Sequence, residues 1–147
     1  MLASGPERIK NPSSSADCRP LLVVANEYFD ALPVRQLVAT EEGWRERMVG
    51  LEGERLVPDA GSQPMDSALP SERRDAPAGT IIETAPAQMA QMHELATRLA
   101  RQGGAALVLD YGYARPHTGS TLQAVRAHEK VDPFAHPSEA DLTAHVD

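Results

Sequence analysis

Cysteine, aromatic side chains and positive charge are all scarce in this sequence of 147 residues. The single cysteine, Cys18, excludes an intrachain disulfide and every metal or redox motif that needs paired cysteines. Only six residues are aromatic, so the core is expected to be aliphatic and small. Lys and Arg number 14 against 21 Asp and Glu, for a formal charge of −7. Because nucleic-acid affinity depends on cations that neutralise phosphates, this balance argues against a nucleic-acid partner.

Long hydrophobic runs are absent too. The longest uninterrupted ones, 21–25 and 105–109, fall far short of the roughly 20 residues that span a bilayer. The stretch 1–20 is rich in serine and proline, and we expect a disordered leader there rather than a signal peptide. No membrane partner is expected, the cytoplasm is the expected location, and 21–147 is expected to be a single domain.

Several motifs that bind phosphates or metals are also missing. No GxGxxG, GxGxG or Walker-type loop occurs, so no nucleotide-binding loop is predicted. The histidines lack close metal-ligand spacing, and no metal site is predicted. Asp141 and His145 are four residues apart, which suits either an acid–imidazole pair or, more simply, a surface pair on one helical face. A hydrolase built on them would lack a GxSxG-type nucleophile.

The two apolar runs indicate an α/β fold. Both runs are continuous rather than alternating, which is typical of strands in a parallel sheet. Between them, Met89 and Met92 lie on one face of a predicted helix that follows Pro86 and ends at Gly103, and we expect these methionines in the core. Since right-handed crossovers join parallel strands, both runs should end at the same edge of one sheet.

Shorter patterns predict the remaining elements. A hairpin is predicted from 34–40 and 44–51, a long surface loop over 58–79 because of its prolines, and short strands at 80–83 and near 121–125. Ser138 and Asp141 have the spacing of a capping box, which predicts a helix that begins near Glu139.

Polar side chains directly follow both apolar runs. Asn26, Glu27 and Asp30 come after the first, and Asp110 and Tyr111 come after the second. Open α/β sheets bind ligands at this edge, where carboxylates could hold a cationic substrate. The alternative is structural: Asn26 or Asp30 caps a following helix, and Asp110 forms a loop before Gly112. The residues alone leave both interpretations open.

Four segments carry a family resemblance: LLVVANEYFDALPVRQ, GWRERMVGL, RQGGAALVLDYG, and TLQAVRAH followed by DPFAHPSEADLTAHVD. They resemble the middle of the MidA-type methyltransferases, which include the protein-arginine methyltransferase that assists assembly of respiratory complex I. The resemblance implies a class I, S-adenosylmethionine-dependent methyltransferase with an incomplete Rossmann-like sheet and an inserted β-hairpin. The family's glycine-rich cofactor loop lies upstream of ANEYFDALP, and this sequence is expected to be a central fragment without it, from a truncated gene model or a degraded gene.

The resemblance also implies roles for the candidate residues. Glu27 would hold the substrate guanidinium with help from Asp30, Asn26 would lie nearest the S-adenosylmethionine methyl group, and Asp110 and Tyr111 would border the substrate. The partner would be a protein with an accessible arginine, and the location would be mitochondrial in a eukaryote. The alternative function is a non-catalytic chain that binds a basic partner. Self-association through an uncovered sheet is expected in either case.

Overall fold

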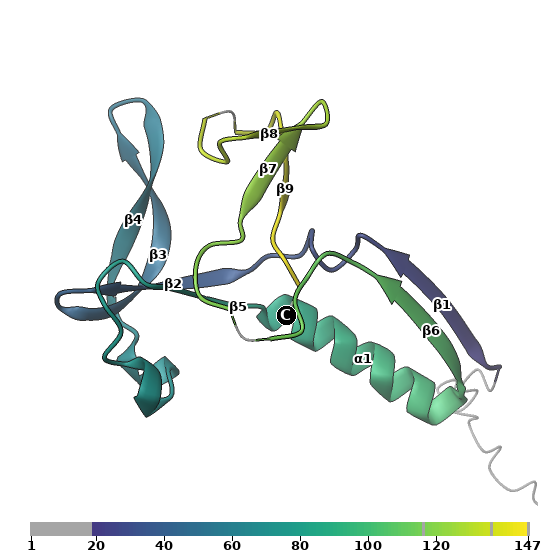
Figure 1. Cartoon of the computed structure of the whole chain (residues 1–147). Helices are drawn as coiled ribbons and strands as arrows, with labels where there is room; N and C mark the ends of the chain where they lie inside the picture. The colour runs from purple at the N-terminus through teal and green to yellow at the C-terminus, as the bar shows by residue number, and fades with distance from the viewer. Residues whose placement is uncertain (1–18, 116, 136, 147) are drawn as a thin grey trace, which may run out of the picture.

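The computed structural model describes residues 19–115, 117–135 and 137–146, which form three β-sheets and one long helix (Figure 1). Nearly all of the predicted leader over 1–20 lies outside the described residues. The two apolar runs form a parallel pair, and the other strands form two antiparallel sheets. The α/β prediction is therefore confirmed in a mixed form, in which parallel and antiparallel sheets coexist.

The parallel pair consists of β1 (Leu21–Asn26) and β6 (Gly104–Leu109). Leu21 lies opposite Gly104, and Asn26 lies opposite Leu109, so the two strands end at the same level. In Figure 1 both arrowheads point toward the middle of the molecule, where the chain continues into the other two sheets. The predicted common edge is confirmed.

The helix α1 (Pro86–Gln102) lies alongside this pair and leads into β6 (Figure 1). Proline occupies its first turn, where no backbone donor is needed, and Gly103 ends it with a φ of 74°. The expectation that Met89 and Met92 lie in the core is wrong: their exposed fractions are 72% and 43%. Helical spacing gives these residues a common face, but that face lines an open cavity and does not pack into a core.

One face of the parallel pair is likewise open. Leu22 and Val24 are 81% and 75% exposed, and Leu107 and Leu109 of β6 are exposed beside them. Strands in parallel sheets are ordinarily covered on both faces. The described residues thus leave an aliphatic surface on β1 and β6.

Gly104 is required where the two strands begin to pair. Its φ is 122°, and a Cβ at this position would lie 1.9 Å from the carbonyl oxygen of Leu21. Gly104→Ala is therefore expected to lower the free energy of unfolding by at least about 2 kcal/mol, as measured by urea titration. The matched control is Gly103→Ala: the φ of Gly103 is also positive, but nothing lies within 4 Å of an added Cβ, so this substitution should cost less than Gly104→Ala. Equal losses would contradict the steric argument.

The largest sheet is antiparallel, with the strand order β4-β3-β2-β5. Its members are β2 (Arg35–Thr40), β3 (Gly43–Glu52), β4 (Arg55–Pro64) and β5 (Ile81–Thr84). The predicted hairpin is confirmed as β2 and β3, and the short strand at 80–83 is confirmed as β5. However, β5 pairs with β2 rather than with the parallel strands, so the whole sheet is inserted between β1 and α1.

The prediction of a surface loop over 58–79 is wrong for its first part, which belongs to β4. Pro58 lies opposite Val49, and Pro64 lies opposite Arg45. Proline is tolerated in β4 because this strand is at the edge of the sheet. The rest of the segment forms two 3-10 turns, η2 (Asp66–Ala68) and η3 (Ser71–Arg73), and Leu69 between them is buried.

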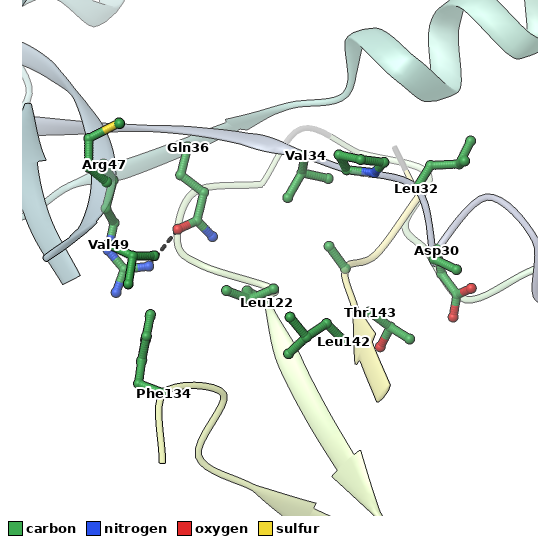
Figure 2. A pocket seen from close by; sticks show the side chains of 14 residues that line it. Asp30, Leu32, Val34, Gln36, Arg47, Val49, Leu122, Phe134, Leu142 and Thr143 are labelled. Carbon is green, nitrogen blue, oxygen red and sulfur yellow. Dashed lines mark hydrogen bonds between the residues drawn. The ribbon is translucent and has the colours of Figure 1, made fainter. Parts of the chain in front are cut away.

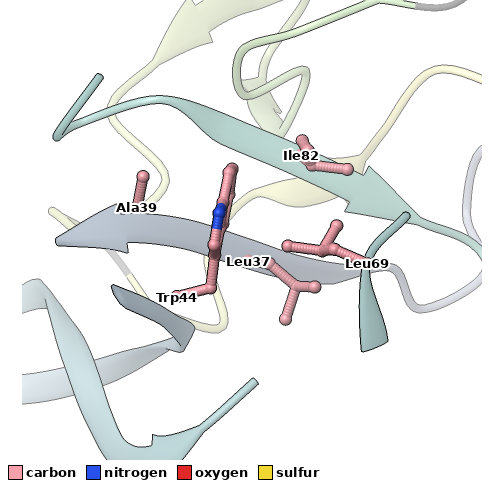
Figure 3. Close-up of a cluster of buried hydrophobic side chains, with 5 residues drawn as sticks. All are labelled: Leu37, Ala39, Trp44, Leu69 and Ile82. Atoms are coloured by element: carbon pink, nitrogen blue, oxygen red, sulfur yellow. The ribbon is translucent and has the colours of Figure 1, made fainter. Parts of the chain in front are cut away.

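The main hydrophobic core lies on this antiparallel sheet. Trp44 is fully buried, and four aliphatic residues pack with it: Leu37, Ala39, Leu69 and Ile82 (Figure 3). The Nε1–H of Trp44 donates a hydrogen bond of 3.0 Å to the carbonyl of Arg74, which satisfies the one polar atom of the indole. The expectation of a small, aliphatic core is confirmed apart from its central tryptophan.

The third sheet has the order β8-β7-β9, with β7 (Gln123–Arg126), β8 (Glu129–Val131) and β9 (Asp141–Thr143). The strand predicted near 121–125 is confirmed as β7. The helix predicted from Glu139 is wrong, because Asp141–Thr143 pairs with β7. Ser138 has a φ of 71°, whereas a helix N-cap has a β-region conformation. Pairing with β7 therefore overrides the local capping pattern.

Candidate functional site

The polar residues that follow β1 and β6 come together as predicted. The N–H of Glu27 donates a hydrogen bond of 2.9 Å to the carbonyl of Leu109, so the pairing continues one residue beyond β1. Glu27 then turns the chain with a φ of 48°. The side chains of Asn26, Glu27 and Tyr28 are exposed. This edge of the sheet therefore presents an amide and a carboxylate to solvent.

Asp110 holds the two loops at this edge together. Its Oδ2 accepts a hydrogen bond of 2.8 Å from the N–H of Phe29, and its Oδ1 accepts one of 3.0 Å from the N–H of Tyr111. Both carboxylate oxygens thus contact backbone donors. These contacts favour the structural alternative for Asp110, while the side chain of Tyr111 stays exposed beside it.

Asp30 is the buried carboxyl group of the site, with an exposed fraction of 6%. Burial raises the pKa of Asp30, and the negative charges of Asp110 and Glu27 raise it further. A hydrogen bond from the N–H of Ala31 and the positive charge available to His145 act in the opposite direction. The three carboxyl groups therefore interact, although they come from two loops far apart in sequence.

The raised pKa makes stability depend on pH. Because ionised Asp30 is less favourable in the folded state than in the unfolded state, its neutral form favours folding, and this advantage is lost as the pH rises through the folded-state pKa. Asp30→Asn is therefore expected to raise the free energy of unfolding at pH 7 and to change it little near pH 3. Urea titrations at both pH values measure this, with the exposed Glu52→Gln as the charge-matched control. A loss of stability at pH 7 would contradict the argument.

The structure separates Asp141 from His145, which the sequence placed on one helical face. Asp141 is in β9, and no helix forms there. His145 instead packs edge to face on Tyr113, with ring centroids 5.3 Å apart, and its Nδ1 is buried without a hydrogen-bond partner among the described residues. His93 and His117 line a cavity of about 610 Å³ with His145, and His136 lies outside the described residues. No group of three metal-binding side chains is found in the part of the chain that the structure describes.

Sequence reasoning missed a buried polar network beside the site. Gln36 is buried, its Nε2 donates to Glu83 and Ser120, and its Oε1 accepts from Arg47. Glu83 also accepts from the N–H and the hydroxyl of Thr121. These contacts join the four-stranded sheet to the segment before β7. No sequence pattern predicts these contacts, because Gln36 lies in an otherwise ordinary strand.

Gln88 was missed as well. It is the only fully buried position that the structure describes in α1, and its Nε2 donates a hydrogen bond of 3.0 Å to the carbonyl of Phe29. This contact fixes the loop after β1 from the helix side, opposite Asp110. A lone glutamine on a helix has no sequence signature of this kind.

A cavity of about 360 Å³ lies between the four-stranded and three-stranded sheets, next to this loop (Figure 2). We call it the inter-sheet cavity. Asp30 lines one end, and Arg47 lines the other. The carboxyl edge of the parallel strands therefore continues into a cleft.

Parallel strands joined through a helix, with polar side chains gathered where both strands end, define an α/β protein of the class in which ligands bind at this edge of the sheet. The chain belongs to the family described as "Putative S-adenosyl-L-methionine-dependent methyltransferase", whose model matches residues 3–147. This confirms the resemblance to the MidA-type methyltransferases.

The relatives agree with this assignment. The chain is 35% identical over 131 residues to the mitochondrial protein arginine methyltransferase NDUFAF7 of Xenopus tropicalis, and 35% identical over 130 residues to that of Homo sapiens. Each alignment covers 84% of this chain but only 29% and 28% of the relative. The chain thus spans less than a third of the length of these relatives.

A solved structure extends the comparison to the fold. It is a COG1565 superfamily member from Burkholderia thailandensis bound to S-adenosyl-homocysteine, and it matches with a TM-score of 0.65 and 30% identity. The match covers 99% of this chain and 37% of that one.

Among the described residues, no helix is both long and apolar enough to cross a membrane.

Proposed function

We propose that this chain forms the substrate side of a methyltransferase that modifies arginine in a protein. The observation that carries the proposal is the meeting of three carboxyl groups, Glu27, Asp30 and Asp110, at the carboxyl edge of β1 and β6. None of the ion pairs between described residues includes any of them. An edge with this excess of negative charge suits a cationic acceptor, and the relatives' names specify protein arginine.

The chemistry of arginine explains the need for carboxylates. The guanidinium stays protonated at any physiological pH, and its planar fork of donors matches a carboxylate in geometry. Glu27, which is exposed, holds the guanidinium and fixes which terminal nitrogen reacts, and Asp30 assists from its buried position. Asp110 supports both loops, and Tyr111 borders the bound side chain.

One described side chain, that of Asn26, is proposed to contact S-adenosylmethionine. When bound, this cofactor supplies a methyl group from its sulfonium sulfur. Asn26 is exposed at the end of β1 and is the side chain that would contact it. The sequence has no glycine-rich loop to receive the rest of the cofactor. We therefore propose that β1 and β6 are neighbouring strands of a Rossmann-like class I sheet, and that 21–147 supplies part of a methyltransferase domain.

Two further expectations belong to this proposal. The expected location is the cytoplasm, or the mitochondrion if the chain comes from a eukaryote; the relatives' names specify the mitochondrion. The open aliphatic face of β1 and β6 makes the isolated chain self-associate, because exposed apolar strands pair readily with other copies.

The test uses a chimera in which 21–147 replaces the matching stretch of the Burkholderia thailandensis protein. With S-adenosylmethionine labelled in its methyl group, we expect label on arginine of an acceptor protein, identified by mass spectrometry. The 147-residue chain alone should bind the cofactor too weakly to saturate at micromolar concentration in calorimetry. Binding of a basic peptide without any transfer by the chimera would favour the non-catalytic alternative.

A further inference from the structure

The buried end of the inter-sheet cavity is a carboxyl group. Asp30 lines the cavity, is almost fully buried, and forms no ion pair with a described cation. The N–H of Ala144 donates a hydrogen bond of 2.9 Å to the carbonyl of Asp30, so the segment after β9 holds the backbone here. A carboxyl group in such a place binds a donor or a cation that enters through the cavity.

The opposite end is a guanidinium. Arg47 donates through Nη1 to the Oε1 of Gln36, and its Cζ lies 5.7 Å from the ring centroid of Phe134. Gln36 is itself held by Glu83 and Ser120, so Arg47 is positioned through a buried network. No described carboxylate forms an ion pair with Arg47. Its other N–H donors can therefore take a carboxylate of a ligand.

The lining between these two ends is apolar. Figure 2 shows Leu122 and Leu142 between Arg47 on one side and Asp30 on the other. The volume of about 360 Å³ accommodates a few side chains rather than a folded partner, and it falls in the lower part of the range for small-ligand pockets, about 300–1,000 Å³. The cavity thus has opposite charges at its ends and an apolar centre.

We propose that the inter-sheet cavity binds an extended segment of the protein substrate in which an arginine, an apolar residue and an acidic residue lie close together. The basic side chain occupies the Asp30 end, the apolar residue lies against Leu122 and Leu142, and the acidic side chain pairs with Arg47. This inference rests on the proposed function, since Asp30 belongs both to the cavity and to the carboxyl edge of the sheet. It adds a sequence preference around the modified arginine.

The test measures binding of a fluorescein-labelled peptide, Gly-Gly-Arg-Leu-Glu-Gly-amide, to the full 147-residue chain by anisotropy. Two analogues replace the arginine by neutral citrulline and the glutamate by glutamine. We expect Asp30→Asn to lower the affinity for the parent peptide about tenfold and to leave the affinity for the citrulline analogue unchanged. Arg47→Met should lower the affinity for the parent peptide by a similar factor and leave the affinity for the glutamine analogue unchanged.

The controls are Glu52→Gln and Arg55→Met, which remove one charge of each sign outside the cavity and should leave the affinity unchanged. Asp30→Asn is expected to be more stable than the parent chain at pH 7, and a urea titration of the variant checks that unfolding does not account for its weaker binding. Parent-peptide binding that neither cavity variant reduces would overturn the proposal, as would equal losses with all three peptides or no binding at millimolar peptide.

The titration contains no methyl donor, so its outcome is independent of transfer. Cavity-dependent binding together with an inactive chimera would refute the proposed function and leave the cavity assignment intact. If the chimera transfers methyl groups but its KM for the peptide does not change in Asp30→Asn or Arg47→Met, the cavity assignment is refuted and the proposed function stands.

Discussion

In the chimera, Glu27→Gln is expected to lower methyl transfer at least about tenfold, because a charge-assisted bond to a guanidinium is worth roughly 1.5 to 3 kcal/mol. Glutamine keeps the shape of glutamate and one acceptor oxygen, but it loses the charge that orients the substrate. The side chain of Glu27 is exposed at the edge, and its backbone N–H is bonded to Leu109, so the substitution leaves the loop in place. The measurement is kcat/KM for an acceptor peptide.

Cofactor affinity should stay nearly constant in the same variant, because Glu27 acts on the acceptor. Glu52→Gln provides the charge-matched control, and Asp30→Asn should reduce transfer less than Glu27→Gln if Asp30 only assists. Full activity of Glu27→Gln combined with loss of activity in Asp110→Asn would move the guanidinium site to the loop after β6. The contacts of Asp110 with Phe29 and Tyr111 make that outcome unexpected.

Trp44→Ala is expected to lower the free energy of unfolding by about 3 to 5 kcal/mol, the range for loss of a large aromatic side chain from a core. The indole is fully buried among Leu37, Leu69 and Ile82. These residues belong to β2, to the segment between η2 and η3, and to β5, respectively. Its removal would also leave the carbonyl of Arg74 without its donor. Urea titration followed by far-UV circular dichroism measures the loss.

Leu51→Ala is the matched control for Trp44→Ala. Leu51 is in β3 as well, but it is exposed near the end of the hairpin, so its removal should change stability by less than about 0.5 kcal/mol. Trp44→Phe should fall between the two, because phenylalanine fills part of the cavity but makes no hydrogen bond to Arg74. A Trp44→Ala variant as stable as Leu51→Ala would show that the core lies elsewhere.

The sequence was informative where a pattern has one physical solution. The strands β1 and β6 could be predicted from two continuous apolar runs, and α1 from helical spacing that ends at a pair of glycines. Each of these patterns depends on local periodicity or on a backbone with positive φ. The prediction of a helix after Pro137 was wrong because the conformation there depends on a distant strand. Ser138 and Asp141 match a capping box locally, but pairing of Asp141–Thr143 with β7 determines the conformation. The strand that contains Pro58 and Pro64 could not be predicted either, since only the strand order shows that β4 is at the edge of the sheet, where proline is tolerated.

The candidate site divides in the same way. The carboxyl edge could be predicted because parallel strands have their carboxyl ends at the same edge of a sheet, and this places Asn26, Glu27 and Asp110 in one region. The roles of Gln36 and Arg47 could not be found, because Glu83 and Ser120, which hold Gln36, come from segments far apart from it in the chain. Gln36 contacts Arg47 and Glu83 on the two neighbouring strands of its own sheet, and its contact with Ser120 reaches the segment before β7. No local pattern encodes this combination.

The burial of Trp44 has a spectroscopic consequence. It is the only tryptophan of the chain, so intrinsic fluorescence reports on the four-stranded sheet and does not register the parallel pair. The helical signal of α1, the one α-helix among the described residues, reports instead on the part of the molecule next to β1 and β6. A fluorescence transition that comes after the loss of helical signal would measure how loosely the edge that carries Glu27 is coupled to the sheet that carries the core.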